Sequence, residues 1–292
     1  MKNDLEITDR IKRLVIVAMV TDDELLARLV LKGGNLLDIA YGISTRASVD
    51  IDFSVDGELN SVANLGDRLK KSLIATFEPE GLTPFDFKFE AVPPHLSDDM
   101  KSFWGGYKIR LKIIESDRYA TLSGNIEQLR KQAIRVGKRG STTFTIDISN
   151  HEYCEEKERW TIDGFTVYGY SPSMIVAEKL RAICQQMPSY AKKVKMNRRA
   201  RARDFVDIKV IVDEFTIDFR DPSFQTICEH TFAAKHVPLG LLQDIEQYRE
   251  YHREDFRSVQ DNVKAGVKLE SYDTYVDFVV GRCKELETLW NK

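Results

Sequence analysis

Apolar and polar positions recur along the chain with two different periods, and these periods predict the order of its elements. The segment 21–24 (TDDE) has the spacing of a capping box, and the apolar residues of 25–30 then recur at helical period until Gly33. We therefore expect a helix that ends at Gly33. A strand is expected to begin near residue 50, with Ile51 and Phe53 facing a core.

The next hundred residues mix helical and alternating patterns. An amphipathic helix is expected over 59–77 and another over 124–134, because apolar residues recur there every three or four positions. Segments 85–89 and 107–113 alternate apolar with charged residues, which is typical of half-buried antiparallel strands. A short strand over 143–148 follows. This order of elements predicts an α+β fold.

The pattern changes near residue 170. A hairpin is expected to turn at Asp163-Gly164, and Ser171-Pro172 then supplies an N-cap followed by proline at the first helical position. From there the chain is predicted to be mainly helical. The expected helices cover 175–186, 200–214, 241–251 and 272–290. We therefore expect two domains, 1–170 and 171–292.

Composition narrows the class of protein. The chain has 292 residues, an apolar fraction of 42% and a net charge of -3, so it can form sizeable cores and carries no overall basic coat. Its four cysteines are far apart and its five histidines show no ligand spacing, which argues against disulfides and a zinc site. With no apolar run of about 18 residues, we expect a cytoplasmic protein that does not enter a membrane. No Walker A, GxSxG or Rossmann motif is present.

The segment from Lys32 to Asp52 combines a glycine pair with two aspartates one residue apart. In a strand, positions i and i+2 face the same side, so Asp50 and Asp52 would project two carboxylates roughly 7 Å apart along the backbone. Divalent cations seek such oxygen ligands. The glycines leave backbone amides open to a phosphate. The pattern favours phosphoryl or nucleotidyl transfer, although D-x-D also occurs on solvated strands without any function.

The order of helix, glycine pair, spacer and D-h-D-h (h is apolar) resembles the nucleotidyltransferase superfamily. Within it, the chain most closely resembles the AbiEii/AbiGii-type toxins of bacterial toxin–antitoxin and phage-defence systems. The residues that carry the resemblance are Lys32-Gly33-Gly34, Tyr41-Gly42, Arg46 and Ser48-Val49-Asp50-Ile51-Asp52-Phe53. The chain departs from the family pattern at two places in the expected phosphate-binding segment. Asn35 stands where the family more often has Ser or Thr, and the spacer to Asp50 is longer.

The resemblance implies a nucleotidyltransferase-fold domain over 1–170, with a small mixed sheet flanked by helices, and a helical domain over 171–292. It implies transfer of an NMP from an NTP to an acceptor with Mg²⁺ or Mn²⁺, and release of pyrophosphate. Some family members modify the acceptor end of tRNA, and an antitoxin is the usual partner. The metal ligands would be Asp50, Asp52 and, from the strand over 143–148, Asp147. The phosphate-binding residues would be Lys32, Gly33, Gly34 and Ser48.

Two helical motifs extend the resemblance. The first, with the family pattern E-K-L-x-A, places Lys179 as a phosphate-binding and catalytic residue, although a lysine beside an apolar stripe can also snorkel. The second, R-D-h-x-D-h, begins at Arg203 and places Asp204 and Asp207 on one helix face. The resemblance assigns nucleotide binding to this motif and a catalytic role to Asp204. A purely structural clamp is the alternative.

A basic run precedes that motif, with seven cations among residues 192–203. Such a run suits contacts with a phosphate backbone, which favours an RNA acceptor, but solvated charged faces look the same in sequence. The predicted acceptor-binding residues are Lys192, Lys193, Lys195, Arg198, Arg199 and Arg201. Two other functions stay open: nucleotidyl transfer to a protein or small molecule, and a catalytically silent binding module.

Overall fold

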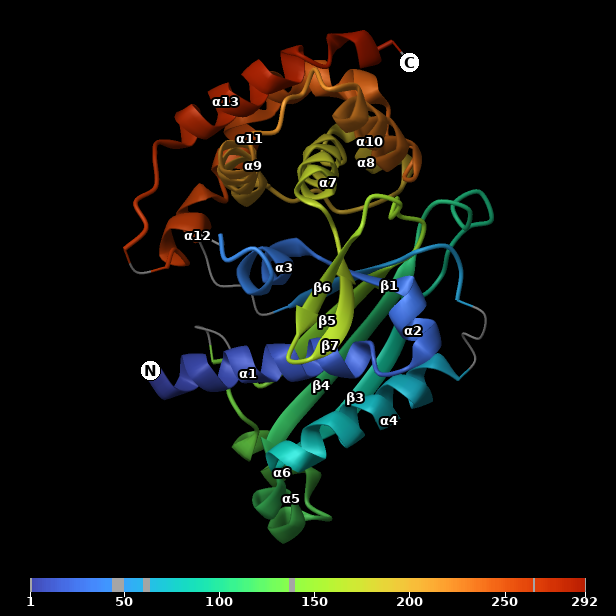
Figure 1. The fold of residues 1–292 in the computed structure, drawn as a ribbon, viewed down its shortest axis with the longest axis vertical. Helices are drawn as coiled ribbons and strands as arrows, with labels where there is room; N and C mark the ends of the chain where they lie inside the picture. The colour runs from blue at the N-terminus through green and yellow to red at the C-terminus, as the bar shows by residue number, and fades with distance from the viewer. Residues whose placement is uncertain (1, 44–49, 60–63, 137–139, 265, 292) are drawn as a thin grey trace. The chain divides into compact units, whose positions relative to one another are not determined.

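The computed structural model describes residues 2–43, 50–59, 64–136, 140–264 and 266–291 (Figure 1). The chain divides into two compact units, and neither is a single continuous segment. The first unit comprises Met1–Ala40, Ser48–His151 and Glu158–Gly169; the second comprises Tyr41–Ala47, Glu152–Lys157 and Tyr170–Lys292. Two short segments that precede Tyr170 thus group with the C-terminal part.

A seven-stranded mixed sheet organises the first unit, in the order β3-β4-β5-β2-β1-β7-β6 (Figure 1). The strands are β1 (Leu29–Lys32), β2 (Ile51–Val55), β3 (Leu82–Val92), β4 (Gly106–Glu115), β5 (Phe144–Ser149), β6 (Glu158–Ile162) and β7 (Phe165–Gly169). The β2·β5 and β1·β7 pairs are parallel and the other neighbours are antiparallel. Helices and a mixed sheet together confirm the expected α+β class.

Two long helices of this unit, α1 and α4, lie side by side (Figure 1). The helices are α1 (Lys2–Met19), α2 (Asp23–Arg28), α3 (Gly33–Ile39), α4 (Leu65–Phe77), α5 (Ser116–Leu122) and α6 (Ile126–Gln132), with the 3₁₀ turn η1 (Glu78–Glu80). In α4, residues Leu65, Leu69, Leu73 and Phe77 repeat every four positions and are at most 1% exposed. This apolar stripe packs α4 into the core.

The register of the sheet shows which face α4 covers. A Cβ added at Gly66 of α4 would lie 3.0 Å from the Phe89 ring, so α4 packs on the Phe89 side. Phe89 pairs with Ile109, which pairs with Ile146, which pairs with Ile51. Since paired residues share a face and successive residues alternate, the side chains of the next positions, including Asp52, project from the opposite face.

The prediction of a helix ending at Gly33 is wrong. Helix α2 ends at Arg28, Leu29–Lys32 forms strand β1, and Gly33 begins α3. All four residues of β1 are buried, so the strand has no polar alternation to distinguish it from a helix. Asp22, and not Thr21, caps α2, because its side chain accepts hydrogen bonds from the amides of Glu24 and Leu25.

The alternating segments are confirmed as strands β3, β4 and β5, and the hairpin does turn at Asp163-Gly164 between β6 and β7. The expected helices over 59–77 and 124–134 are found as α4 and α6. Helices α1 and α5 were not predicted. In both, apolar and charged residues follow one another without a clear cap signal in the sequence.

The second unit is built from helices. They are α7 (Pro172–Cys184), α8 (Pro188–Lys193), α9 (Ala202–Phe215), α10 (Pro222–Ala233), α11 (Arg249–Arg253), α12 (Phe256–Asp261) and α13 (Tyr272–Lys284), with the 3₁₀ helices η2 (Leu239–Tyr248) and η3 (Glu287–Leu289). Ser171 caps α7 as predicted, with its hydroxyl accepting from the Met174 amide. Helix α7 is buried around almost its whole circumference and contacts both α9 and α10.

One predicted helix of this unit has a different geometry. Most of the helix expected over 241–251 is the 3₁₀ helix η2, which continues into the short α11. Among the helices described, none is long and apolar enough to span a bilayer.

Candidate active site

Four charged residues form a row across four strands of the first unit. Lys32 of β1 pairs with Asp52 of β2, Asp52 pairs with Asp147 of β5, and Asp147 pairs with Lys108 of β4. Paired positions lie on one face, so the row reads cation, anion, anion, cation along this face. The Lys108 Nζ forms an ion pair with Asp147 Oδ1 at 2.9 Å. The row lies on the face opposite α4.

The two carboxylates of the row occupy neighbouring strands about 4.8 Å apart. Like charges directly opposite one another in a sheet are unfavourable, so a cation at each end of the row offsets their repulsion. Lys108 was not predicted from the sequence. Its only signal is its place as a charged residue in an alternating strand, and the partner across the sheet becomes visible only with the register.

Gly33 brings the backbone against one of these carboxylates. Its φ is +75°, a conformation that L side chains rarely adopt, and a Cβ built there would lie 2.7 Å from Asp52 Oδ2. Only glycine allows the start of α3 to approach Asp52 this closely. Gly34 follows in the first turn of α3 and is half-buried. The glycine pair therefore begins a helix beside the carboxylate row.

Asp50 stands immediately before β2, and its side chain is exposed. Asn35 of α3 is fully buried, and its Nδ2 donates to the Asp50 carbonyl oxygen at 2.6 Å. The residue that departs from the family's Ser or Thr thus fixes the chain at Asp50. Ser48, together with Arg46 and Val49 of the same motif, lies outside the described residues.

The donor set of this row fits a hard divalent cation. Asp52 and Asp147 offer carboxylate oxygens from adjacent strands, and Mg²⁺ is commonly held by one or two carboxylates together with substrate phosphates. The lack of a Cβ at Gly33 lets the start of α3 lie against the Asp52 carboxylate. Within the described residues, no three His, Cys, Asp or Glu side chains gather closely enough to hold a metal by themselves.

A second charged cluster lies in the helical unit. The Lys179 Nζ of α7 donates to Asp204 Oδ1 at 3.1 Å and to Asp207 Oδ2 at 2.7 Å, both on α9. The three side chains are 6–9% exposed. Asp204 and Asp207 lie one helical turn apart, so both reach the same lysine. Lys179 therefore does not extend to solvent, and its partners are the two predicted aspartates.

The charge of this cluster is not balanced by the lysine alone. Burial by itself would raise the pKa of Asp204, but the charge of Lys179 and of the two arginines that precede Asp204 holds this pKa well below its usual range. One of these, Arg201, places its Nε 3.4 Å from Asp204 Oδ2. Arg203 is half-buried, with a buried Nε that has no hydrogen-bond partner among the described residues.

His252, one of the five histidines without ligand spacing, belongs to the same cluster. It is fully buried, and its Nδ1 accepts a hydrogen bond from the Arg201 amide at 3.0 Å. Burial lowers the pKa of His252 to about 4, so the ring is neutral near pH 7. The histidine orients the start of α9, which carries both aspartates. It lies 45 residues after Asp207, too far for any local motif to reveal it.

A third buried charge network ties a distant segment to the helical unit. Arg181 of α7 donates through Nη1 to Glu152 Oε2 at 2.6 Å, and Lys235 Nζ lies 3.5 Å from Glu152 Oε1. All three side chains are at most 6% exposed. This network explains why Glu152–Lys157 groups with the second unit. Arg181 therefore pairs with Glu152 and not with the aspartates of α9.

The six predicted acceptor-binding cations differ in their surroundings. Lys192 and Lys193 end helix α8, and both are exposed, as are Lys195 and Arg199. Arg198 is exposed as well, but its guanidinium lies over an aromatic ring. Arg201 is half-buried and pairs with Asp204. Five of the six are thus exposed, and the sixth belongs to the buried cluster.

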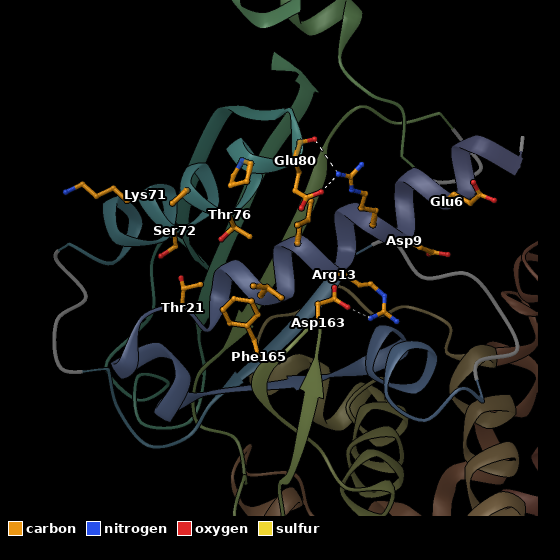
Figure 2. A pocket seen from close by; sticks show the side chains of 15 residues that line it. Glu6, Asp9, Arg13, Thr21, Lys71, Ser72, Thr76, Glu80, Asp163 and Phe165 are labelled. Atoms are coloured by element: carbon orange, nitrogen blue, oxygen red, sulfur yellow. Dashed lines mark hydrogen bonds and ion pairs between the residues drawn. The ribbon is translucent and has the colours of Figure 1, made fainter. Parts of the chain in front are cut away.

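A hollow of about 1080 Å³ lies between α1, α4 and the β6–β7 turn (Figure 2). Ion pairs border it: Arg10 with Glu80, and Arg13 with Asp163 at 2.9 Å. Phe165, which is 45% exposed, also lines it. None of the row's four residues is among those that line it. The hollow is therefore separate from the carboxylate row.

A carboxylate pair flanked by lysines, on a mixed sheet and beside a glycine-initiated helix, is typical of enzymes that act on nucleotide phosphates. A protein-family model described as "Nucleotidyl transferase AbiEii toxin, Type IV TA system" matches residues 16–278. The chain therefore belongs to the AbiEii nucleotidyltransferase toxin family of type IV toxin–antitoxin systems. Membership of this family implies an NTP substrate.

Solved structures give further likenesses. JHP933 from Helicobacter pylori is 16% identical, with a TM-score of 0.49, over 100% of this chain and 94% of that one. Another H. pylori structure, described as a candidate nucleotidyltransferase, has the same identity and TM-score and is covered over 97% of its length. An antigenic nucleotidyltransferase-like protein from Paracoccidioides brasiliensis is 15% identical, with a TM-score of 0.35, over 77% of this chain and 93% of that one. None of the curated proteins matches the chain in sequence.

Proposed function

We propose that this toxin transfers a nucleoside monophosphate from an NTP to an RNA acceptor, with Mg²⁺ or Mn²⁺ bound at the carboxylate row and pyrophosphate as the second product. The tRNA 3′ end is the proposed acceptor site. The observation that carries the proposal is the row Lys108, Asp147, Asp52, Lys32 beside the Gly33 backbone.

The carboxylates, the glycine pair and Lys32 each have a proposed task. Asp52 and Asp50 would bind a divalent cation, with Asp147 as a third ligand or as the base that accepts the proton of the attacking hydroxyl. When bound, the cation would neutralise phosphate charge and stabilise the entering and leaving oxygens. The backbone amides of the Gly33-Gly34 pair at the start of α3, together with Lys32, would bind the triphosphate.

The helical unit is proposed to contribute to nucleotide binding through Lys179, Asp204, Asp207 and Arg203. In this unit Lys179 is paired with two carboxylates, so the cluster carries a net negative charge that the neighbouring arginines offset. A phosphate that competes for Lys179 would exchange one anionic partner for another. This role rests on the family motif.

An RNA acceptor is proposed because of the exposed cations between residues 192 and 199. In a chain of net charge -3, this is a local concentration of positive charge of the kind that contacts a phosphate backbone. A cognate antitoxin is the proposed protein partner, as the type IV toxin–antitoxin family implies.

The test is to incubate the protein with Mg²⁺, total bacterial RNA and each radiolabelled NTP in turn, beside a D50A/D52A double variant. We expect label to enter a tRNA-sized band with wild-type protein and not with the variant. Omission of the divalent cation should abolish the label as well.

Three other outcomes would contradict parts of the proposal. Label found only in a protein or a small molecule would show that this molecule, and not RNA, is the acceptor. Equal labelling by the D50A/D52A variant would show that the transfer does not need these two carboxylates. No label in any component, with a folded protein, would favour a catalytically silent module.

A further inference from the structure

Arg198 is an exposed side chain held in one defined position. Its guanidinium carbon lies 4.2 Å from the centre of the Tyr251 ring and 5.8 Å from that of Tyr248. Its Nε donates to the carbonyl oxygen of Gln186, which is buried. An exposed arginine ordinarily samples many rotamers, and ordering its side chain costs about 2 kcal/mol. Here a ring and a hydrogen bond both restrict it.

The backbone around Arg198 is held in the same way. The Arg199 amide donates to Gln186 Oε1 at 2.7 Å, and the Arg201 amide donates to His252 Nδ1 at 3.0 Å. Gln186 and His252 are 2% and 0% exposed. A segment whose side chains are exposed cations is therefore anchored to two buried residues. A merely solvated basic loop needs no such anchors.

Arg253 of the same unit also lies over a tyrosine ring, but it differs from Arg198 because carboxylates pair with its charge. Arg253 lies 4.7 Å from the centre of the Tyr272 ring, and its guanidinium forms ion pairs with Asp273 and Glu250. Its charge is thus satisfied within the protein. By contrast, no carboxylate of the described residues forms an ion pair with Arg198 or Arg199, nor with Lys192 or Lys195. The charge of this second group is available to a ligand.

We propose that Arg198, supported by Tyr251, is a stacking platform for an unpaired base of single-stranded RNA, with the neighbouring phosphates contacting Lys192, Lys195 and Arg199. The guanidinium of Arg198 lies over the Tyr251 ring while the residue stays exposed, and unpaired RNA bases stack on arginine guanidinium planes. Surrounding cations then contact the backbone. This inference rests on the proposed RNA acceptor and specifies that the bound segment is unpaired.

The experiment measures binding by fluorescence anisotropy, with the full chain, Mg²⁺ and no NTP. The probes are a labelled RNA of about ten nucleotides as a single strand, the same sequence as a blunt duplex, and the single strand with abasic nucleotides. R198K keeps the charge and removes the plane. R253K is the matched control, because it makes the same change at a stacked arginine whose charge is already paired. Y251L removes the ring beneath Arg198.

We expect wild-type protein to bind the single strand more tightly than the duplex. R198K and Y251L should each weaken single-strand binding by at least about fivefold, because a base stack is worth about 1–3 kcal/mol. For R198K, the slope of log K against log salt should be unchanged, since the number of cations is the same. The abasic strand should bind wild type and R198K equally, and R253K should bind like wild type.

The inference would be overturned by equal binding of single strand and duplex, or by R198K binding the single strand as tightly as wild type. If R198K loses as much affinity for the abasic strand as for the intact single strand, Arg198 contacts phosphates and does not stack on a base. If polyglutamate, added as a competitor, displaced the single strand more effectively than unlabelled RNA does, the result would overturn the inference and point to an acidic protein partner. Because the assay contains no NTP, a protein that binds single strands through Arg198 but transfers no nucleotide would retain this inference and contradict the proposed function.

Discussion

Replacement of Gly33 by alanine is expected to disable the carboxylate row while leaving the protein folded. The added Cβ would lie 2.7 Å from Asp52 Oδ2, whereas ordinary contact begins at 3.4 Å. Either the carboxylate or the start of α3 must therefore move by about 0.7 Å. The backbone at this position, with φ of +75°, adds a cost of about 1–2 kcal/mol for any residue with a Cβ.

The expected loss of activity follows from this displacement. A misplacement of about 1 Å in a catalytic constellation can lower the rate about a hundredfold, so kcat/KM for nucleotide transfer should fall about 10- to 100-fold. A folded domain is typically stable by about 5–15 kcal/mol, so the backbone cost alone should not unfold the protein.

Gly81→Ala is the matched control. Gly81 has φ of +69°, and no atom lies within 4 Å of the position that an added methyl group would occupy, so alanine there bears the backbone cost without touching a carboxylate. Transfer of label from an NTP to RNA and urea unfolding would be measured for both variants. We expect similar losses of stability but loss of activity only for Gly33→Ala.

Full activity of a folded Gly33→Ala protein would refute this reasoning, because Asp52 would then not need its observed position. Equal loss of activity in Gly33→Ala and Gly81→Ala would refute it differently. That result would assign the effect to backbone strain in general.

Three further predictions concern the buried charges of the helical unit. Lys179→Met should lower the free energy of unfolding by about 3–5 kcal/mol, since it leaves Asp204 and Asp207 buried without their cation; a urea-unfolding loss below about 1 kcal/mol would contradict the buried triad. Glu152→Gln should lower the free energy of unfolding by about 3 kcal/mol, because Arg181 and Lys235 lose their counter-charge. Glu285→Gln, which affects a more exposed pair with Arg282, should lower it by less than about 1 kcal/mol. Equal losses in urea unfolding would contradict the idea that burial makes the Glu152 network matter more. The pKa of His252 is lowered from 6.5 to about 4, so the unfolded chain binds more protons between these values and stability falls as pH drops through this window, by up to about 3 kcal/mol. His252→Gln should remove this part of the pH dependence, and identical stability curves for both proteins between pH 7 and 4 would count against it.

Strand positions with one solvated face could be predicted from the sequence, and those with two buried faces could not. The alternation in β3, β4 and β5 leaves a polar residue at every second position, which sets both the period and the face. Strand β1 is apolar from Leu29 to Leu31 and its one charged residue, Lys32, is buried, so its sequence does not distinguish it from the end of a helix. The role of Gly33 then changed from ending one helix to beginning another.

The candidate site shows the same limit at the level of side chains. Asp50, Asp52 and Lys179 stand in local motifs and could be selected from sequence. Lys108 and His252 could not, because their partners come from another strand or from a helix far along the chain. Local spacing predicts which side chains share one element, but contacts across elements depend on register and packing.

Nucleotide transfer to tRNA is tested by the intact mass of purified tRNA after incubation with the protein, Mg²⁺ and all four NTPs. We expect a mass increase equal to one or more nucleoside monophosphate residues with wild-type protein, and no increase with Asp52→Asn, which preserves the size of the side chain. An unchanged tRNA mass with wild-type protein, or an equal increase with Asp52→Asn, would contradict it.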